Sequence, residues 1–301
     1  MSERRQDFIT RFDWIRRALV FEPRGHDMMS GGFLYPPCDP ANDLGVLFIE
    51  TSGCLPMCGH GTIGIITFAI EHGLVRPRVA GRLSVEVPAG VIGIEYRASG
   101  DKVCGVTIRN VPAYVAARGV PVEVPGLGPL QVDVAYGGNF YAIIEPQGEY
   151  QGIDELGAVR IQALSPLVRQ ALRRVIEPVH PLDATIRGVS HVMWTGSPKT
   201  PGAHGRNAVF YGERAIDRSP CGTGTSARLA HLAAQGLLKE GEPFVHESII
   251  GSCFTGRIEA TLSLAGQPAV IPSIEGAAFA TGFNTIWIDP SHPFPEGFHV
   301  S

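Results

Sequence analysis

The chain has 301 residues, a formal net charge of −4 at pH 7, 44% hydrophobic residues and 18% charged residues. This composition predicts a sizeable core. The slightly acidic balance, without a run of Lys or Arg, gives no electrostatic reason to expect nucleic acid or an anionic membrane as a partner. Residues 1–20 lack the apolar stretch of a signal peptide, and no apolar run reaches the ~18 residues of a membrane span. We therefore expect a soluble, cytoplasmic protein.

The six cysteines lie at positions 38, 54, 58, 104, 221 and 253. Without an export signal they are expected to be reduced thiols rather than a disulfide framework. Cys54, Cys58 and His60 offer three metal donors within a short stretch, but no second pair at structural-zinc spacing accompanies them, so no metal site is predicted. The chain has only three lysines, none in a glycine-rich setting, which disfavours a pyridoxal enzyme without excluding it.

The first informative element in chain order begins with an apolar run at 46–49, which predicts a strand. Ser52 and Gly53 predict a turn. The segment after Cys58 predicts a helix over 62–72, followed by Gly73, a residue type suited to the left-handed conformation beyond a helix end. The junction reads MCGHGTIG, which combines the glycine spacing of a dinucleotide-binding turn with a cysteine directly in front of it.

A stretch rich in proline and glycine at 123–133 is the best candidate for a domain boundary. We place the division after residue 128, so that 1–128 form the first domain and 129–282 the second. Linker composition alone does not divide the chain further.

A second copy of the first element lies at 209–238 and aligns with 46–75 position by position, without a gap. In both copies the cysteine stands at the same distance from the opening valine and begins the sequence Cys-Gly-x-Gly-Thr, and Gly-Leu follows at the same distance from the cysteine. The second copy therefore predicts a strand, a turn and a helix over about 225–235 that ends at Gly236. Both helices are apolar on more than one face and are expected to be largely buried.

Cys58 and Cys221 each stand just before a predicted helix, where unpaired N–H groups and the positive end of the helix dipole favour an anion. A helix N-terminus can also lower a thiol pKa from about 8.5 towards roughly 3.5–7.5, so both cysteines are candidate reactive bases. A dinucleotide site is a weaker interpretation. Pro56 and Pro220 interrupt the step from strand to glycine, and two such turns would imply two cofactors.

If the two copies are related by a pseudo-twofold axis, their helix N-termini can face each other across a cleft. Two thiols would then flank one small ligand, whose carboxylate would receive N–H bonds from both helices. This arrangement suits the removal of a proton from one face of a carbon and the delivery of another to the opposite face, with coupled titration of the two thiols. A redox pair or two buried structural cysteines remain alternatives.

MCGHGTIG at 57–64 and DRSPCGTGTSA at 217–227 closely resemble the two signatures of the proline racemase family, which includes 4-hydroxyproline 2-epimerases and trans-3-hydroxyproline dehydratases. EPRGHDMM at 22–29, NVPAY at 110–114 and IIGSCFTGRI at 249–258 also resemble this family. The resemblance implies an α+β, diaminopimelate-epimerase-like fold of two pseudo-symmetric β-barrel domains, each around a central helix, with the active site between them. It further implies catalysis without cofactor or metal, a small amino-acid substrate, and allows a homodimer.

The resemblance also bears on the two ends of the chain. It implies that about 283–301 complete the first domain, with FNTIWIDP at 283–290 as a returning strand and the closing residues as surface coil. Family members usually open with a further segment that forms early strands of the first domain. This chain begins with residues that resemble the part just after that segment, so we expect the N-terminal segment of the family to be missing.

Carried over onto the matching positions, the resemblance makes Cys58 and Cys221 the paired acid and base. Asp217 and His60 would contact the substrate amine. The substrate carboxylate would be held by four backbone N–H groups, those of Gly59, His60, Gly222 and Thr223. Dehydratases of the family typically carry threonine in place of the second cysteine, so Cys221 favours racemisation or epimerisation.

Proline racemases of the family line their ring pocket with phenylalanines, whereas this chain offers Ser30, His191 and Tyr211 by position. Polar groups there suit a ring hydroxyl, since a buried donor left unpaired costs ~1–3 kcal/mol. We therefore predict a 4-hydroxyproline 2-epimerase that converts trans-4-hydroxy-L-proline to cis-4-hydroxy-D-proline. A proline racemase, or an inactive truncated homologue that only binds its ligand, is the alternative.

Overall fold

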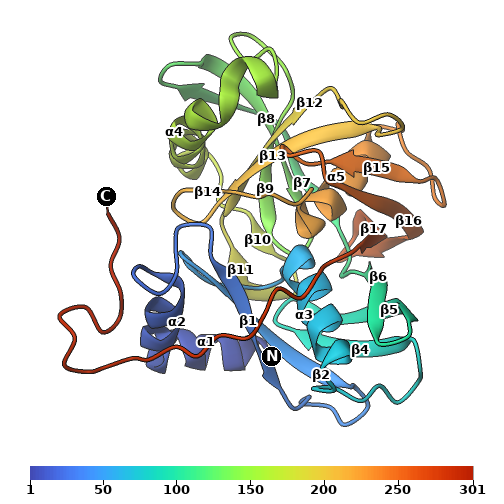
Figure 1. Cartoon of the computed structure of the whole chain (residues 1–301). Helices are drawn as coiled ribbons and strands as arrows, with labels where there is room; N and C mark the ends of the chain where they lie inside the picture. The colour runs from blue at the N-terminus through green and yellow to red at the C-terminus, as the bar shows by residue number, and fades with distance from the viewer. Residues whose placement is uncertain (301) are drawn as a thin grey trace.

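The first half of the chain forms six strands and three helices in the computed structural model, which describes residues 1–300. The strands are β1 (Ser30–Tyr35), β2 (Leu44–Glu50), β3 (Gly53–Leu55), β4 (Arg82–Val87), β5 (Gly90–Ser99) and β6 (Lys102–Arg109). The helices, blue to cyan in Figure 1, are α1 (Ser2–Arg11), α2 (Asp13–Val20) and α3 (Gly59–Glu71).

The second half contributes most of the strands and two helices. The strands of the main sheet are β7 (Tyr114–Val124), β8 (Gly128–Tyr136), β9 (Phe140–Ile144), β12 (His191–Gly196), β13 (Gly205–Tyr211), β14 (Ala215–Ile216), β15 (Phe244–Glu247), β16 (Cys253–Leu264) and β17 (Gln267–Gly276). A separate pair is formed by β10 (Val179–His180) and β11 (Asp183–Arg187). The helices are α4 (Ile153–Arg173), kinked at Gly157, and α5 (Gly222–Ala234). No helix within residues 1–300 is long and apolar enough to cross a membrane.

The strands of both halves join into one 15-stranded mixed sheet. Its order is β1-β2-β4-β5-β6-β17-β16-β15-β13-β12-β9-β8-β7, with β3 attached to β2 and β14 to β13. Strand β17 is the junction, because it pairs antiparallel with β6 on one side and with β16 on the other. The chain therefore returns to its first half near its end, and α3 and α5 come to lie next to each other near the middle of the molecule (Figure 1).

The repeated sequence folds in the same way twice. Antiparallel pairs, β2 with β3 and β13 with β14, lead into α3 and α5. Gly73 and Gly236 follow these helices with φ of +66° and +73°, the left-handed conformation that the sequence predicts. Both helices begin earlier than predicted, at Gly59 and Gly222, because the glycine turn itself takes up helical geometry.

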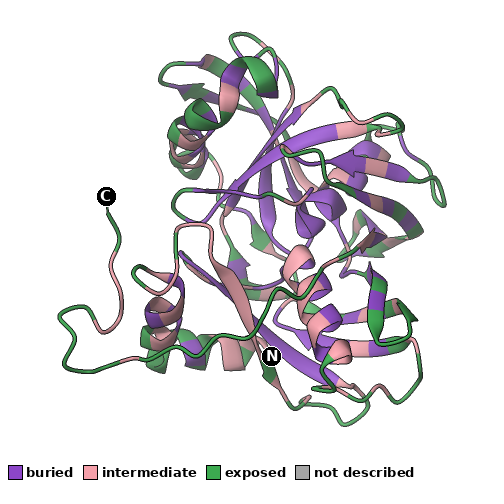
Figure 2. Ribbon diagram, viewed as in Figure 1, coloured by how far each residue is buried: buried purple, intermediate pink, exposed green. Residues whose placement is uncertain are grey.

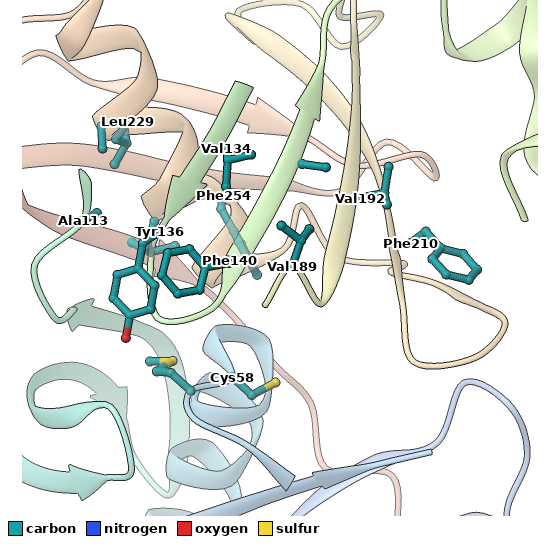
Figure 3. Packing of buried hydrophobic residues seen from close by; sticks show 14 of the residues in the cluster. Cys58, Ala113, Val134, Tyr136, Phe140, Val189, Val192, Phe210, Leu229 and Phe254 are labelled. Atoms are coloured by element: carbon teal, nitrogen blue, oxygen red, sulfur yellow. The ribbon is translucent and has the colours of Figure 1, made fainter. Parts of the chain in front are cut away.

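The core extends through the second half and reaches the start of α3. Helix α5 is buried along most of its length, as predicted, whereas α3 keeps one partly exposed face (Figure 2). Val134, Tyr136 and Phe140 of β8 and β9 belong to the same apolar cluster as Cys58, which lies at the start of α3 (Figure 3). The two halves therefore share one core where their helices meet.

The strand predicted at 283–290 is wrong, because this segment is coil. It passes across α3 and then in front of α1 and α2 (Figure 1). The ring of Phe283 lies 5.1 Å from that of Phe68 in α3, yet Phe283 and Trp287 remain 74% and 84% exposed. A strand needs the edge of another strand for its hydrogen bonds, and a path along helices offers none. Residues 291–300 form surface coil, as predicted.

Candidate active site

Two helix N-termini meet end to end at the centre of the molecule. Helix α3 begins at Gly59 in the first half and α5 begins at Gly222 in the second. A Cβ atom added to Gly59 would lie 2.5 Å from the Cα of Gly222, and one added to Gly222 would lie 2.6 Å from the Cα of Gly59. Non-bonded carbon atoms settle at about 3.5–4.0 Å. Only glycine at both positions therefore permits this approach.

The second glycine of each motif makes room for a sulfur atom. A Cβ atom on Gly61 would lie 2.9 Å from Cys58 Sγ, and one on Gly224 would lie 3.0 Å from Cys221 Sγ. Each thiol therefore lies against the first turn of its own helix, where unpaired N–H groups favour negative charge. Because the thiol and the opposite helix occupy this space, the Cys-Gly-x-Gly motif holds a sulfur atom and leaves no room for a dinucleotide.

A narrow cavity, with an accessible volume of only about 10 Å³, lies where the two helices meet. Cys58 and Cys221 line it from opposite halves, and both are buried, with 6% and 4% of their surface exposed. All ten residues predicted for the site line this cavity, namely Ser30, Cys58, Gly59, His60, His191, Tyr211, Asp217, Cys221, Gly222 and Thr223. Leu55 and Met57 complete the wall. The structure thus brings the predicted residues together, and their individual roles stay predictions.

His60 and Asp217 form an ion pair across the two halves. His60 Nδ1 lies 3.0 Å from Asp217 Oδ2, and Ser30 Oγ lies 3.3 Å from His60 Nε2. Burial opposes the charge on His60, but the negative charge and hydrogen bond of Asp217, with a smaller contribution from the Cys58 sulfur, outweigh it and raise the pKa of His60 well above its usual value. Burial likewise opposes the charge on Asp217, and His60 with Ser219 holds the pKa of Asp217 below its usual value. The cavity therefore contains an imidazolium beside a carboxylate.

This pairing predicts a large change in the His60 titration when Asp217 is replaced. In Asp217→Asn the carboxylate charge is lost while the burial that opposes protonation remains, so the pKa of His60 falls. We expect the fall to exceed about 1 pH unit, since a charge-assisted hydrogen bond is lost as well. The measurement is a pH titration of the His60 ring signals by NMR on ¹³C-labelled protein. An unchanged His60 pKa in Asp217→Asn would contradict the pairing.

Cys221 has a backbone conformation that non-glycine residues rarely adopt, with φ of 63° and ψ of 106°. Such strain costs on the order of 1–3 kcal/mol and persists only where neighbouring contacts hold it. The Cys221 N–H donates to Ser219 Oγ at 3.0 Å, and Asn207 Nδ2 donates to the Pro220 carbonyl oxygen at 2.7 Å. The turn that precedes α5 is therefore fixed by the surrounding structure, as is typical of functional sites.

The pKa of Cys221 differs from the value that its helix position predicts. Burial raises the pKa of Cys221, and the nearby charge of Asp217 raises it further. Favourable contacts with Tyr141 and His60 are smaller influences. The prediction of a lowered pKa is therefore wrong for Cys221, because loss of hydration outweighs the helix dipole in this enclosed cavity. Cys221 is a thiol at neutral pH.

Two side chains beside Cys221 escaped sequence analysis. Tyr141 Oη lies 3.2 Å from Cys221 Sγ and also contacts Thr223 Oγ1, and Asn139 Nδ2 lies 3.2 Å from that Thr223 oxygen. Tyr141 belongs to β9, an apolar strand without a recognisable motif, and Asn139 lies directly before this strand. Only the parallel pairing of β9 with β12, which sets Tyr141 beside His191, brings them to the site.

Three polar side chains, Ser30, His191 and Tyr211, line the side of the cavity predicted to face the substrate ring. The rings of His191 and Tyr211 are nearly parallel, with centroids 6.1 Å apart. Burial, with a contribution from the charge of Arg169, lowers the pKa of His191 to about 3. His191 is therefore neutral at physiological pH, and its ring can both donate and accept a hydrogen bond.

Cys54 lies apart from the cavity, although it is close to Cys58 in the sequence. It belongs to β3 and is buried, and burial raises its pKa to about 11. Within residues 1–300, no group of three or more His, Cys, Asp or Glu side chains is placed to hold a metal ion. Cys54 is thus a buried cysteine outside the cavity, and substitutions at Cys54 can serve as controls for substitutions at Cys58 and Cys221.

Known proteins resemble this chain over nearly all of its length. The family model described as proline racemase matches residues 1–299. A 4-hydroxyproline epimerase from Brucella ovis is 58% identical over 301 residues, which are 100% of this chain and 90% of that protein. The structure of a hydroxyproline epimerase from Agrobacterium vitis with bound trans-4-hydroxy-L-proline is 29% identical, with a TM-score of 0.91 over 99% of this chain and 86% of that chain.

More distant structures resemble the chain in fold alone. A phenazine biosynthesis protein of the PhzF family from Bacillus anthracis is 13% identical, with a TM-score of 0.58 over 86% of this chain and 84% of that chain. The large mixed sheet with few helices is therefore shared beyond the relatives that carry similar sequences.

Proposed function

This chain belongs to the proline racemase family, and we propose that it is a 4-hydroxyproline 2-epimerase that works through the thiols of Cys58 and Cys221. It is an isomerase of the racemase and epimerase class. One observation carries the proposal: two buried thiols from opposite halves line one small cavity at the meeting point of two helix N-termini. This arrangement suits the inversion of a carbon that lies between the thiols.

The helix N-termini would bind the substrate carboxylate. The N–H groups of Gly59 and His60 in α3, and of Gly222 and Thr223 in α5, belong to the first turns and have no partner within their helices. Together with the two helix dipoles they favour a carboxylate and the additional negative charge that develops on it when Cα loses a proton. Asp217 would accept hydrogen bonds from the substrate ammonium group.

The proposed reaction exchanges one proton for another on opposite faces of Cα. A thiolate removes the proton as the Cα–H bond breaks, and the electron pair delocalises into the carboxylate. The opposite thiol then gives its proton to the other face of Cα and becomes a thiolate. Cys221 fits the donor role at the start of one direction, because burial keeps it protonated. Each turnover leaves the protonation of Cys58 and Cys221 exchanged, so the next turnover in the same direction requires proton exchange with solvent.

The polar wall of the cavity supports hydroxyproline rather than proline as substrate. Neutral His191 can bond a ring hydroxyl, and Ser30 with Tyr211 offers two further hydroxyl groups. With proline, the ring nitrogen of His191 that is not bonded to Ser190 would lose its partner, which costs ~1–3 kcal/mol. A site that bonds a substrate hydroxyl therefore discriminates strongly against the analogue without it.

Replacing His191 with phenylalanine is expected to shift the preference towards proline. In His191→Phe, kcat/KM for trans-4-hydroxy-L-proline should fall relative to kcat/KM for L-proline by at least about 10-fold, because only the hydroxylated ring loses a hydrogen bond. Polarimetry or chiral chromatography on both substrates measures this ratio. His180→Phe, a change outside the cavity, is the control and should leave the ratio unchanged. An equal loss with both substrates in His191→Phe would contradict recognition of the hydroxyl by His191.

The two-domain architecture forms part of the same proposal. We take residues 1–128 with about 283–301 as one barrel-like domain around α3 and 129–282 as the other around α5. The equivalent strand-turn-helix units and the end-to-end contact of the helices support this division. This division places β7 in the first domain and nearly all of its hairpin partner β8 in the second, and β17 pairs with both β6 and β16, so the two domains would share one continuous sheet.

Proton NMR in D₂O tests the function directly. Purified protein is incubated separately with trans-4-hydroxy-L-proline and with L-proline. We expect the C2 proton signal of hydroxyproline to disappear while cis-4-hydroxy-D-proline appears. Faster exchange with L-proline would favour a proline racemase, and binding of either compound by a folded sample without exchange would refute epimerase activity for this chain.

A further inference from the structure

A chain of hydrogen bonds leads across the interface of the two halves to Cys221. Asn139 Nδ2 lies 2.7 Å from the Met57 carbonyl oxygen and 3.2 Å from Thr223 Oγ1. Tyr141 Oη contacts the same Thr223 oxygen and lies 3.2 Å from Cys221 Sγ. Asn139, Tyr141 and Thr223 are all buried. This chain of hydrogen bonds thus runs from the backbone of Met57, the residue before Cys58, to the thiol of Cys221.

When Cys221 is a thiolate it can only accept, so the direction of this chain follows, because a protonated Tyr141 must then donate to the sulfur atom. Asn139 Nδ2 only donates, and turning its amide over would place two oxygen atoms 2.7 Å apart at Met57. Thr223 Oγ1 therefore accepts from Asn139, and its own hydrogen can point at Tyr141 Oη. The Tyr141 hydrogen is then free to point at Cys221 Sγ. In this arrangement the bonds from Asn139 onward donate towards the sulfur atom, while Asn139 is held from the other side by the Met57 carbonyl oxygen.

The internal repeat shows why Cys221 needs such a donor. When the two copies are aligned on their cysteines, Thr223 occupies the position that His60 occupies in the first copy. Cys58 therefore has a protonated histidine close by, whereas the equivalent residue beside Cys221 is a neutral threonine. A thiolate at Cys221 is buried, so each donor that faces it matters. The backbone N–H of Gly224 is one such donor, and the Tyr141 hydroxyl is the side-chain donor.

We propose that Tyr141 is a positioning residue that donates a hydrogen bond to the Cys221 thiolate, and that Asn139 and Thr223 hold the tyrosine hydroxyl in the donating orientation. This inference rests on the proposed two-thiol function. Each time Cys221 gives its proton to the substrate, the thiolate left behind is stabilised by the Tyr141 hydroxyl. Burial raises the pKa of Tyr141 well above its usual value, so the hydroxyl keeps its proton while the sulfur atom loses its own.

The test compares Tyr141→Phe with Tyr136→Phe. Tyr136 is buried one strand away, and its hydroxyl has no hydrogen-bond partner within residues 1–300, so its loss removes a buried hydroxyl without removing a bond. The rate at which iodoacetamide alkylates Cys221 is measured by peptide mass spectrometry between about pH 7 and 9. In this range the alkylation rate reports the fraction of Cys221 that is thiolate. We expect Tyr141→Phe to slow alkylation about 10-fold at each pH, equivalent to about 1 unit in pKa, and Tyr136→Phe to leave it unchanged.

Epimerase activity gives a second, separate readout. In Tyr141→Phe, kcat/KM should fall about 10- to 100-fold in both directions, because the thiolate forms in each. If Tyr141→Phe does not fold, Thr223→Val removes the middle hydroxyl and should slow alkylation in the same way, while Thr223→Ser, which keeps the hydroxyl, should be alkylated faster than Thr223→Val. Wild-type alkylation rates in Tyr141→Phe, or in Thr223→Val, would overturn the inference. A wild-type protein that alkylates as expected but epimerises nothing would overturn the proposed function instead.

Discussion

Replacing either Cys58 or Cys221 with serine is expected to lower kcat/KM for epimerisation by at least about 10³-fold. Each cysteine must both accept and donate a proton within one catalytic cycle, and positioned acid-base groups contribute about 10²–10⁴-fold each. A serine hydroxyl is far less acidic than a thiol, so it neither becomes a base nor gives up its proton easily near neutral pH. The buried setting of both cysteines strengthens this difference, since no bulk water replaces the lost group.

The natural control for these variants is Cys54→Ser. It makes the same substitution at a buried cysteine in the adjoining strand, outside the cavity, and should keep kcat/KM within about twofold of wild type. Rates are measured by polarimetry with trans-4-hydroxy-L-proline, and circular dichroism confirms folding. If Cys221→Ser retained substantial epimerisation, water or another group would have to deliver the second proton, and the two-thiol mechanism would be wrong.

The change from Gly59 to alanine is expected to lower kcat/KM by at least about 100-fold with little loss of helix. The added Cβ atom would lie 2.5 Å from Gly222 Cα, so the backbones of the two helices must move apart by roughly 1 Å. This displacement separates the thiols and the two sets of carboxylate-binding N–H groups at once. A misplacement of about 1 Å at a catalytic site can cost 10²-fold in rate.

Gly64→Ala in the same helix is the matched control. No atom from outside the local helix backbone lies within 4 Å of a Cβ atom built at Gly64, so alanine there should keep full activity. Alanine is also favoured over glycine inside a helix by roughly 0.5–1 kcal/mol, which predicts an unchanged or slightly raised Tm. Both variants are compared by kcat/KM and by thermal unfolding. Full activity in Gly59→Ala would show that the end-to-end contact of the helices is not required.

Local patterns in the sequence were sufficient to predict the central elements of the site. The repeated Cys-Gly-x-Gly-Thr turn predicted a thiol at each of two helix starts, and Gly73 with Gly236 predicted the helix ends. These features depend on neighbouring residues along the chain, because the conformation of a turn and a helix end is set within a few residues. The resemblance to proline racemases then predicted that the chain belongs to this family, and the match of the family model over residues 1–299 confirms it.

Other features depended on contacts between distant segments. The strand predicted at 283–290 did not form, because a strand exists only where another strand offers an edge, and this segment runs along helices. Tyr141 belongs to an apolar strand that gives no hint of chemistry, and it reaches Cys221 through the pairing of β9 with β12. The spacing of residues in the sequence does not show which strand pairs with β9 or in which register.

The pKa of Cys221 shows most clearly what only the tertiary structure decided. Its place at a helix start predicted a lowered pKa, whereas enclosure by both halves raises it. The helix dipole is a local property that the sequence determines through the position of the helix. Loss of hydration depends on every segment that covers the thiol, and it outweighs the dipole once the cavity is closed. The sequence by itself therefore determined which groups can react, and the packing of the two halves decided that Cys221 keeps its proton.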